Sequence, residues 1–377
     1  MEKIKRIYRF LRYKNERRKV KQEREIKLQQ NLLIQKSGLT NSNKLIVFLV
    51  PGSDWFSGED NITGGILSIA SLLEESSKLN EVHGGDTIMM THPGEHLLLK
   101  HKKFKNNITV YRYDQLFTDF PKLKEIILHI PEYLVPYFLQ PQLNNYLQEL
   151  KKLNFVHINI LNQNIRLMPT PNQVKELKKW ANLVTQTTAH EKYSSKEQWE
   201  KYGISLHKFS VFGGPHRYRR GTFDEKLDRI IISPDDRPYK EQVLNNIKNQ
   251  LSALDQVIIK NMSYEDYLST IANTRYAITF GEGLDFYFLE TVFCGGVGIA
   301  VYNQDFFPES WHSLPGIFSD EIDLVENLNS FLADLENDVE LYKTVQNQQY
   351  ETSSQLYNFE EYQHNIRKFY LGEYTFK

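Results

Sequence analysis

The chain has 377 residues, of which 40% are hydrophobic and 25% charged, and its formal net charge is −1 at pH 7. These values are typical of a globular protein of about two domains, and no apolar run reaches the 18 residues of a membrane-spanning helix. The single cysteine, Cys294, excludes a disulfide framework and favours a reducing, cytoplasmic compartment. Cys294 itself is expected to be a small buried core residue.

Positive charge is concentrated at the start of the chain. Residues 1–27 contain twelve Lys or Arg and four Glu, and we assign residues 1–42 to a basic helical arm. Apolar side chains recur in it at helical spacing, namely Ile4, Ile7, Tyr8 and Leu11. A helix with this pattern presents a narrow apolar stripe flanked by cations, so we expect residues 1–27 to bind an anionic membrane surface. A packed or disordered arm is one alternative. Nucleic-acid binding is another, and it is disfavoured because the rest of the chain has no basic face interleaved with aromatic residues.

The first half, assigned to residues 43–215, begins with a strand. Residues 44–50 form a continuous apolar run, which is typical of a central parallel strand. A loop with several glycines leads into a helix over 66–74, so Gly64 and Gly65 lie at a helix N-terminus. Backbone amides at such a terminus can approach a phosphate. A tight turn without a ligand is the alternative.

Strands and helices alternate through the rest of this half, with strands expected over 86–90, 109–113, 154–160 and 183–185. This alternation predicts an α/β fold with a doubly wound sheet. His157 lies in one of these strands, whose end at 161–164 is polar, so it could face a cleft and bond a ligand there. A buried core histidine is the alternative. His92, in a loop after a strand, is a candidate for an acceptor contact.

The second half, assigned to residues 216–355, follows a Gly-Gly-Pro hinge at 213–215. A strand is expected over 229–233, with a helix soon after it. Arg237 and Lys240 fall at the carboxyl end of that strand and the N-terminus of that helix, where two cations can stabilise a leaving diphosphate. A solvated loop with internal salt bridges is the alternative.

Residues 282–290 carry two carboxylates across a strand-to-helix turn. Glu282 follows an apolar strand over 276–280 and lies in a glycine-rich loop, and Glu290 lies inside the apolar helix expected over 286–293. In open parallel sheets, ligands bind at the carboxyl ends of the strands. We therefore expect chemistry at this turn, with an ordinary capped turn as the alternative.

The segment from Glu282 to Glu290 resembles a signature of retaining GT-B glycosyltransferases, especially family 4, in which seven residues separate two glutamates. The chain keeps Gly283 but has Leu284 and Asp285 where that family usually has glycine and leucine. The resemblance implies the GT-B fold, in which two Rossmann-like domains face a cleft. Residues 43–215 would then be the acceptor domain and residues 216–355 the nucleotide-sugar domain. The resemblance also implies a nucleotide-diphosphate sugar donor lying between those domains.

The resemblance further implies a role for each candidate residue. Glu290 accepts the ribose hydroxyls, and Glu282 and His157 act near the donor sugar. The remaining donor contacts are assigned to Gly64, Gly65, Arg237, Lys240, Gly283 and Leu284. No protein nucleophile is required, because the departing diphosphate can accept the proton of the acceptor hydroxyl. No metal or other cofactor is expected, since the sequence has no Asp-x-Asp triplet and no metal-ligand spacing.

The implied activity is transfer of a sugar to a glycan or lipid-linked acceptor in cell-surface polysaccharide synthesis, at the inner face of the plasma membrane if the arm binds lipid. Alternatives are an inverting GT-B transferase or a sugar-nucleotide epimerase, either of which uses a carboxylate or histidine of the first half as base. A non-catalytic scaffold that partners an active transferase is a further alternative. Residues 356–377 are expected to form a terminal helix that crosses back to the first domain, as in GT-B proteins.

Overall fold

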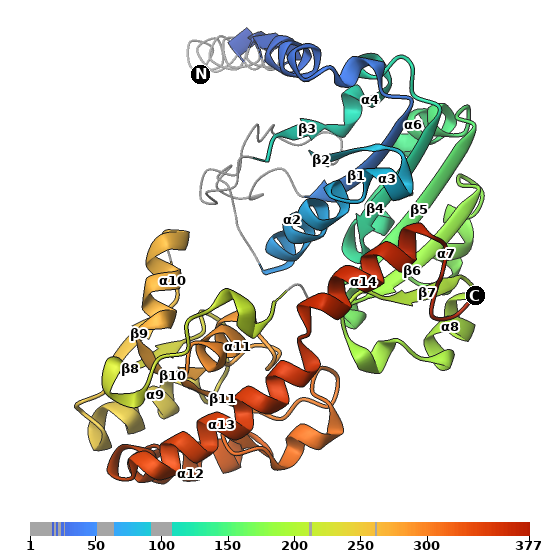
Figure 1. Cartoon of the computed structure of the whole chain (residues 1–377). Helices are drawn as coiled ribbons and strands as arrows, with labels where there is room; N and C mark the ends of the chain where they lie inside the picture. Colours follow the sequence, from blue (N-terminus) through green and yellow to red (C-terminus); the bar gives the residue numbers. More distant parts are fainter. Residues whose placement is uncertain are drawn as a thin grey trace, which may run out of the picture.

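The computed structural model describes residues 17–18, 20–21, 24–25, 27–50, 64–91, 108–210, 213–260 and 262–377. Within them, two parallel β-sheets form the centres of two Rossmann-like α/β units, one above the other in Figure 1. The expected α/β fold class is confirmed.

The first sheet has seven parallel strands in the order β3-β2-β1-β4-β5-β6-β7. They are β1 (Lys44–Val50), β2 (Asp86–Thr91), β3 (Val110–Arg112), β4 (Glu125–Pro131), β5 (Phe155–Asn162), β6 (Leu183–Thr188) and β7 (Ser205–Lys208). β4 and β7 are additional to the strands expected from the sequence. Side chains of β1 alternate between two buried clusters, one on each face of the sheet. A central strand covered on both faces therefore needs the continuous apolar run that β1 has.

Helices cover both faces of this sheet. They are α2 (Gly64–Ser77), α3 (Asn80–His83), α4 (Leu116–Asp119), α5 (Val135–Phe138), α6 (Asn144–Leu150), α7 (Pro171–Leu177) and α8 (Lys196–Tyr202). α2 packs on one face, and apolar side chains of α4, α5, α6 and α7 fill the cluster on the other.

The second sheet has five parallel strands in the order β12-β11-β10-β8-β9. They are β8 (Leu227–Ile232), β9 (Asp255–Ile258), β10 (Thr274–Ile278), β11 (Val297–Val301) and β12 (Ile317–Phe318). The helices α9 (Lys240–Gln250), α10 (Tyr264–Ala272) and α11 (Phe286–Phe293) lie between consecutive strands. α11 follows the limits expected from the sequence, and six of its eight residues are buried. Cys294, directly after it, is 3% exposed, which confirms its expected core position.

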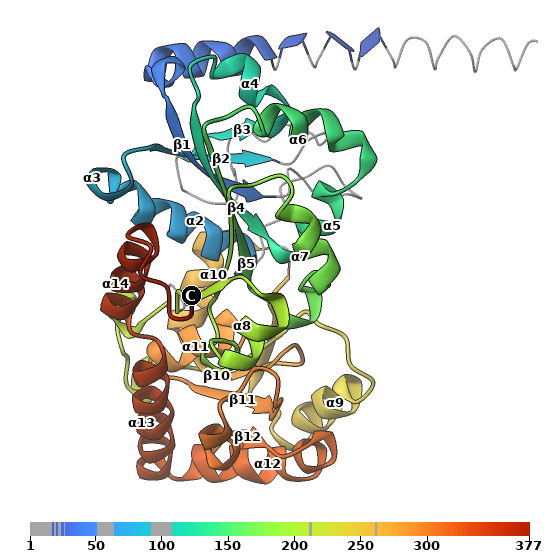
Figure 2. The ribbon, with the colours of Figure 1, turned by 90° about the vertical axis from the view of Figure 1, so that its right-hand side faces the viewer.

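Three helices end the chain: α12 (Glu321–Asn337), α13 (Val339–Leu356) and α14 (Phe359–Tyr370). Asp338 separates the first two, because its carboxylate accepts the backbone N–H groups of Glu340 and Leu341 and so caps a new helix. Figure 2 shows α13 beside the second sheet and α14 beside the first. Apolar side chains of α14 join the buried cluster that α2 also fills, so the last helix ties the second unit to the first.

The described part of the N-terminal arm is helical up to residue 37. Gln30 and Ile34 are its buried residues, and the Gln30 side chain donates to the Asp119 carboxylate at 2.6 Å and accepts the Arg112 backbone N–H at 3.0 Å. The helix is thus attached to the first unit at its C-terminal end. No helix within the described residues is long and apolar enough to cross a membrane.

Candidate functional site

The loop between β10 and α11 is held in one shape by its own residues. Gly283 has φ +110°, and a Cβ added to it would lie 2.0 Å from the ring of Phe307, so both the backbone conformation and the space require glycine. The Asp285 carboxylate accepts the Thr279 hydroxyl, which links the two ends of the loop. Glu282 is therefore presented from a rigid turn.

Glu282 points across to the first unit. Its carboxylate accepts a hydrogen bond from the side-chain amide of Asn164, which follows β5. Its backbone carbonyl accepts the side-chain amide of Asn303 at 3.2 Å. Burial raises the pKa of Glu282, and the nearby Asp285 carboxylate raises it further. The carboxyl ends of β5 and β10 thus meet at Glu282.

A buried carboxyl group holds the segment after β5 in place beside Glu282. Glu132, just after β4, is 1% exposed and accepts the backbone N–H groups of Gln163 at 3.2 Å and Asn164 at 3.0 Å. Burial raises the pKa of Glu132 to about 7. Glu132 thereby holds the segment whose side chain bonds Glu282.

Gly65 lies on the same side of the first unit, in the first turn of α2. The side-chain amide of Gln163 donates to its carbonyl at 2.9 Å, and a Cβ on Gly65 would lie 2.9 Å from the Gln163 side-chain oxygen. A cavity of about 170 Å³ is lined by Gly65, Gln163, His190, Glu282, Leu284 and Phe306, among other residues. Residues from both units therefore meet at one cavity, and Gly65, Glu282 and Leu284 are among the expected site residues.

Arg237 and Lys240 lie beside this loop without lining that cavity. Arg237 donates from Nε to the Phe280 carbonyl at 2.8 Å and from Nη2 to the Gly281 carbonyl at 3.2 Å. Lys240 Nζ donates to the carbonyls of residues 233 and 235 at 2.8 and 2.7 Å. The two cations thus lie at the carboxyl ends of β10 and β8. A guanidinium has five N–H donors and an ammonium three, so each retains donors beyond these bonds.

Glu290 is buried, 4% exposed, and its two carboxylate oxygens accept the hydroxyls of Tyr218 and Tyr267. Burial raises its pKa. In this conformation, the positions expected to bind ribose hydroxyls are taken by tyrosine hydroxyls. Glu290 is accordingly not brought to the cavity of Glu282.

The structure places His157 in the core of the first unit and not among the residues that line the cavity of Glu282. His157 is the third residue of β5, far from the carboxyl end of that strand, and it is 4% exposed. Its Nε2 lies 2.8 Å from the Thr185 hydroxyl, and its ring stacks on Phe369 of α14. Burial lowers its pKa to about 3, as expected of a neutral core histidine. His92 lies outside the described residues.

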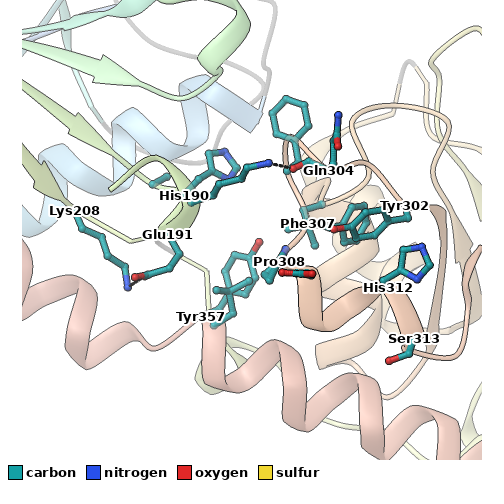
Figure 3. A pocket seen from close by; sticks show the side chains of 16 residues that line it. His190, Glu191, Lys208, Tyr302, Gln304, Phe307, Pro308, His312, Ser313 and Tyr357 are labelled. Atoms are coloured by element: carbon teal, nitrogen blue, oxygen red, sulfur yellow. Dashed lines mark hydrogen bonds and ion pairs between the residues drawn. The ribbon is translucent and has the colours of Figure 1, made fainter. Parts of the chain in front are cut away.

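A second and larger cavity of about 880 Å³ adjoins the first (Figure 3). It lies between the segments after β6 and β11, and Leu356 and Tyr357, at the junction of α13 and α14, also line it. The two cavities share five of their lining residues, namely Ala189, His190, Leu284, Phe306 and Tyr357.

Bonds between the two units surround these cavities. Arg166 pairs with Asp305 at 2.6 Å, and the Tyr193 hydroxyl donates to the Asp305 carbonyl, also at 2.6 Å. Lys192 donates to the backbone carbonyl of Gln304. The two units are therefore in direct contact on this side.

Sequence reasoning missed Glu132, Asn164 and His190 as residues of the site. Each lies within three residues of the carboxyl end of its strand: β4, β5 and β6. Polar residues directly after an apolar strand could have indicated these positions, and residues 162–164 show this pattern. Among the described residues, no group of three or more His, Cys, Asp or Glu is placed to hold a metal ion.

No protein-family model matches the chain, and no curated protein matches its sequence. Its fold is similar to that of a sucrose-phosphate synthase from Thermosynechococcus elongatus, with a TM-score of 0.52 over 87% of this chain and 98% of the other at 11% identity. A lipopolysaccharide outer core galactosyltransferase matches with a TM-score of 0.49 over 88% and 99% of the two chains at 10% identity. A UDP-GlcNAc 2-epimerase from Neisseria meningitidis matches with a TM-score of 0.41 over 88% of this chain and 99% of the other, at 10% identity.

At these identities the comparison concerns the fold alone. The chain has the GT-B fold, with two Rossmann-like domains whose strand ends face each other. The expected fold is thereby confirmed.

Proposed function

We propose that the protein is a glycosyltransferase that moves a sugar from a nucleotide-diphosphate sugar to a glycan or lipid-linked acceptor in cell-surface polysaccharide synthesis. One observation carries the proposal. Gly65, at the start of a helix in one GT-B domain, and Glu282, in the rigid loop before α11 of the other, line the same cavity. A helix N-terminus and a carboxylate facing one space suit a phosphate on one side and a sugar on the other.

The cations beside this loop fit the departure of a diphosphate. When the bond between the anomeric carbon and the diphosphate oxygen breaks, negative charge grows on that oxygen. Arg237 and Lys240 lie at the two strand ends next to Glu282, and their remaining N–H donors can bind the phosphate oxygens. The acceptor oxygen forms the new bond to the anomeric carbon, and its proton passes to the diphosphate. With attack on the same face, the reaction retains the anomeric configuration and requires no metal.

Ribose binding at Glu290 requires an exchange. The two tyrosine hydroxyls that the carboxylate now accepts would be replaced by two ribose hydroxyls, so the number of O–H donors to Glu290 is conserved. Tyr267 belongs to α10, and a shift of this helix would release the carboxylate. Nucleotide binding is thus coupled to movement of α10.

An inverting reaction is the second candidate, and His190 favours it. His190 lines both cavities, and burial lowers its pKa, so its imidazole is neutral at pH 7 and able to accept a proton. The anomeric configuration of the product, determined by proton NMR, separates the two candidates. Loss of turnover in His190→Gln together with inversion would establish the second.

The first experiment is a thermal-shift titration with nucleoside diphosphates and nucleotide sugars. We expect one nucleoside diphosphate to stabilise the protein by roughly 1 to 3 kcal/mol, and Arg237→Ala and Glu290→Ala to abolish the effect. Arg229→Ala is the matched control, because Arg229 is an arginine of the same domain paired with Asp255 on the neighbouring strand. Absence of a shift with every nucleotide would contradict the proposal and favour a non-catalytic scaffold.

We further propose that the arm binds the inner face of the plasma membrane. Most of residues 1–27 lie outside the described part. The helix that follows them exposes Leu28, Leu32 and Leu33 between Lys27 and Lys36, so its apolar side chains could extend the membrane contact of the basic arm. Sedimentation with phosphatidylglycerol vesicles should exceed that with phosphatidylcholine vesicles and fall in Leu28→Ser/Leu32→Ser. Leu341→Ser, at an exposed leucine of α13, is the control. Equal sedimentation of all these proteins would refute the assignment.

A further inference from the structure

The large cavity lies beside the proposed transfer site, and Gly65, Arg237, Lys240 and Glu282 are not among the residues that line it. It extends from His190 and Leu284, which also line the Glu282 cavity, to Tyr302, His312 and Ser313 in the second domain. A molecule that occupies both cavities therefore has one end at Glu282 and the other near η9 (Glu309–Ser313). The volume of the large cavity, about 880 Å³, lies in the range of sites for ligands larger than a single ring.

The lining combines aromatic rings with polar groups that have spare hydrogen-bonding capacity. Tyr357 is 2% exposed, and no described residue hydrogen-bonds its hydroxyl, which Figure 3 shows directed into the space between His190 and Phe307. The rings of Tyr302 and His312 lie edge to face, 4.8 Å apart, at the other end. This hydroxyl, which has no partner among the described residues, can donate to or accept from a ligand in the cavity.

The charges of the lining indicate an uncharged ligand. Two lysines and two glutamates line the cavity, and the Lys208 ammonium is already paired with Glu191 and, at 3.0 Å, with Glu361. Lys192 is bonded to a backbone carbonyl. A lining with balanced charge, in which the Lys208 ammonium is already paired, gives no preference for a polyanion such as a lipid diphosphate. Aromatic faces beside hydroxyl, amide and imidazole groups instead match the apolar faces and hydroxyls of sugar rings.

We propose that the large cavity is an acceptor subsite for an uncharged oligosaccharide, whose terminal residue receives the new sugar at Glu282. The preceding sugars lie over Tyr357 and reach Tyr302 and His312. This inference rests on the proposed transferase function and specifies its acceptor: a glycan of two or more neutral residues bound between the domains.

The test is direct binding, which needs no turnover. Neutral oligosaccharides of one to four residues, from malto-, chito- and galacto-oligosaccharide series, are titrated against the full chain by saturation-transfer NMR. We expect one series to bind, with affinity rising at least tenfold from the monosaccharide to the trisaccharide. Tyr302→Ala should remove that rise and Tyr357→Phe should reduce it. Tyr374→Ala is the matched control, since Tyr374 is a partly exposed tyrosine beside α14 outside the cavity.

The outcomes separate the two proposals. If a nucleoside diphosphate binds but no oligosaccharide does, or if oligosaccharide binding survives both substitutions, the subsite is refuted and the transferase function stands. If no nucleotide binds, the transferase function falls, and the subsite falls with it as an acceptor site. Donor hydrolysis to free sugar, which needs no acceptor, should proceed at an unchanged rate in Tyr302→Ala; a loss there would place Tyr302 in the donor site and overturn the assignment.

Discussion

The buried carboxyl of Glu132 makes the stability of this protein depend on pH in a direction opposite to that of a salt-bridged acid. Burial raises the pKa of Glu132 from 4.5 to about 7, so the folded protein holds the proton more tightly than the unfolded chain. This contribution to stability is fully present below pH 4.5 and is lost as the pH rises through 7. At about 1.4 kcal/mol per pKa unit, the loss is about 3 kcal/mol in total, of which about 2.5 kcal/mol falls between pH 5 and 8.

Glu132→Gln removes the titration. It retains one of the two side-chain oxygens, so one of the backbone N–H groups of Gln163 and Asn164, which now bond to separate oxygens, keeps its acceptor. We expect the free energy of unfolding in urea, followed by circular dichroism, to fall between pH 5 and 8 by about 2.5 kcal/mol more in the wild type than in the variant. Histidines that titrate over this range are common to both proteins and cancel in the difference.

Two further measurements complete this test. Glu340 is an exposed carboxylate of α13, so Glu340→Gln should follow the wild type at every pH. The infrared band of a protonated carboxyl group should be present at pH 5 in the wild type and weaker in Glu132→Gln. If the free energies of unfolding of the wild type and Glu132→Gln change in parallel from pH 5 to 8, the reasoning is refuted. Glu132 would then be ionised in the folded protein.

Three other predictions concern single residues. Gly283→Ala places a Cβ against the Phe307 ring at φ +110° and should destabilise the protein by about 2 kcal/mol or more, lowering the thermal midpoint and turnover together. His157→Leu should cost about 1 to 3 kcal/mol of stability and leave KM unchanged, whereas a raised KM would return His157 to the site. Tyr267→Phe removes a competitor for Glu290 and should tighten nucleoside diphosphate binding about fivefold, for about 1 kcal/mol; weaker binding in calorimetry would contradict the exchange.

The sequence predicted elements well where a local pattern decides them. β1 is a continuous apolar run, and α11 has the limits that its glycine-flanked apolar segment implies. Both depend on side chains close together along the chain, which pattern reasoning reads directly. The division between α12 and α13 depends instead on an N-cap, the carboxylate of Asp338, which accepts the backbone N–H groups of Glu340 and Leu341.

Site residues were less predictable, because a site joins strands that are distant in sequence. His157 has the residue type and the strand of a catalytic histidine, but position along the strand and cover by α14 place it in the core. Asn164 bonds Glu282 although 118 positions separate them. Glu290 is capped by tyrosines 72 and 23 positions away.

The sequence by itself determined the class of fold, the two Rossmann-like halves and the glycine-rich loop that presents Glu282, since each is set by local patterning and backbone conformation. The tertiary structure alone decided which strand ends meet, which polar groups are already satisfied, and where a cavity remains between the domains. Those features depend on contacts between distant segments. A carboxylate such as Glu282 or Glu290 therefore acquires its environment, and with it its chemistry, only when the two sheets are brought together.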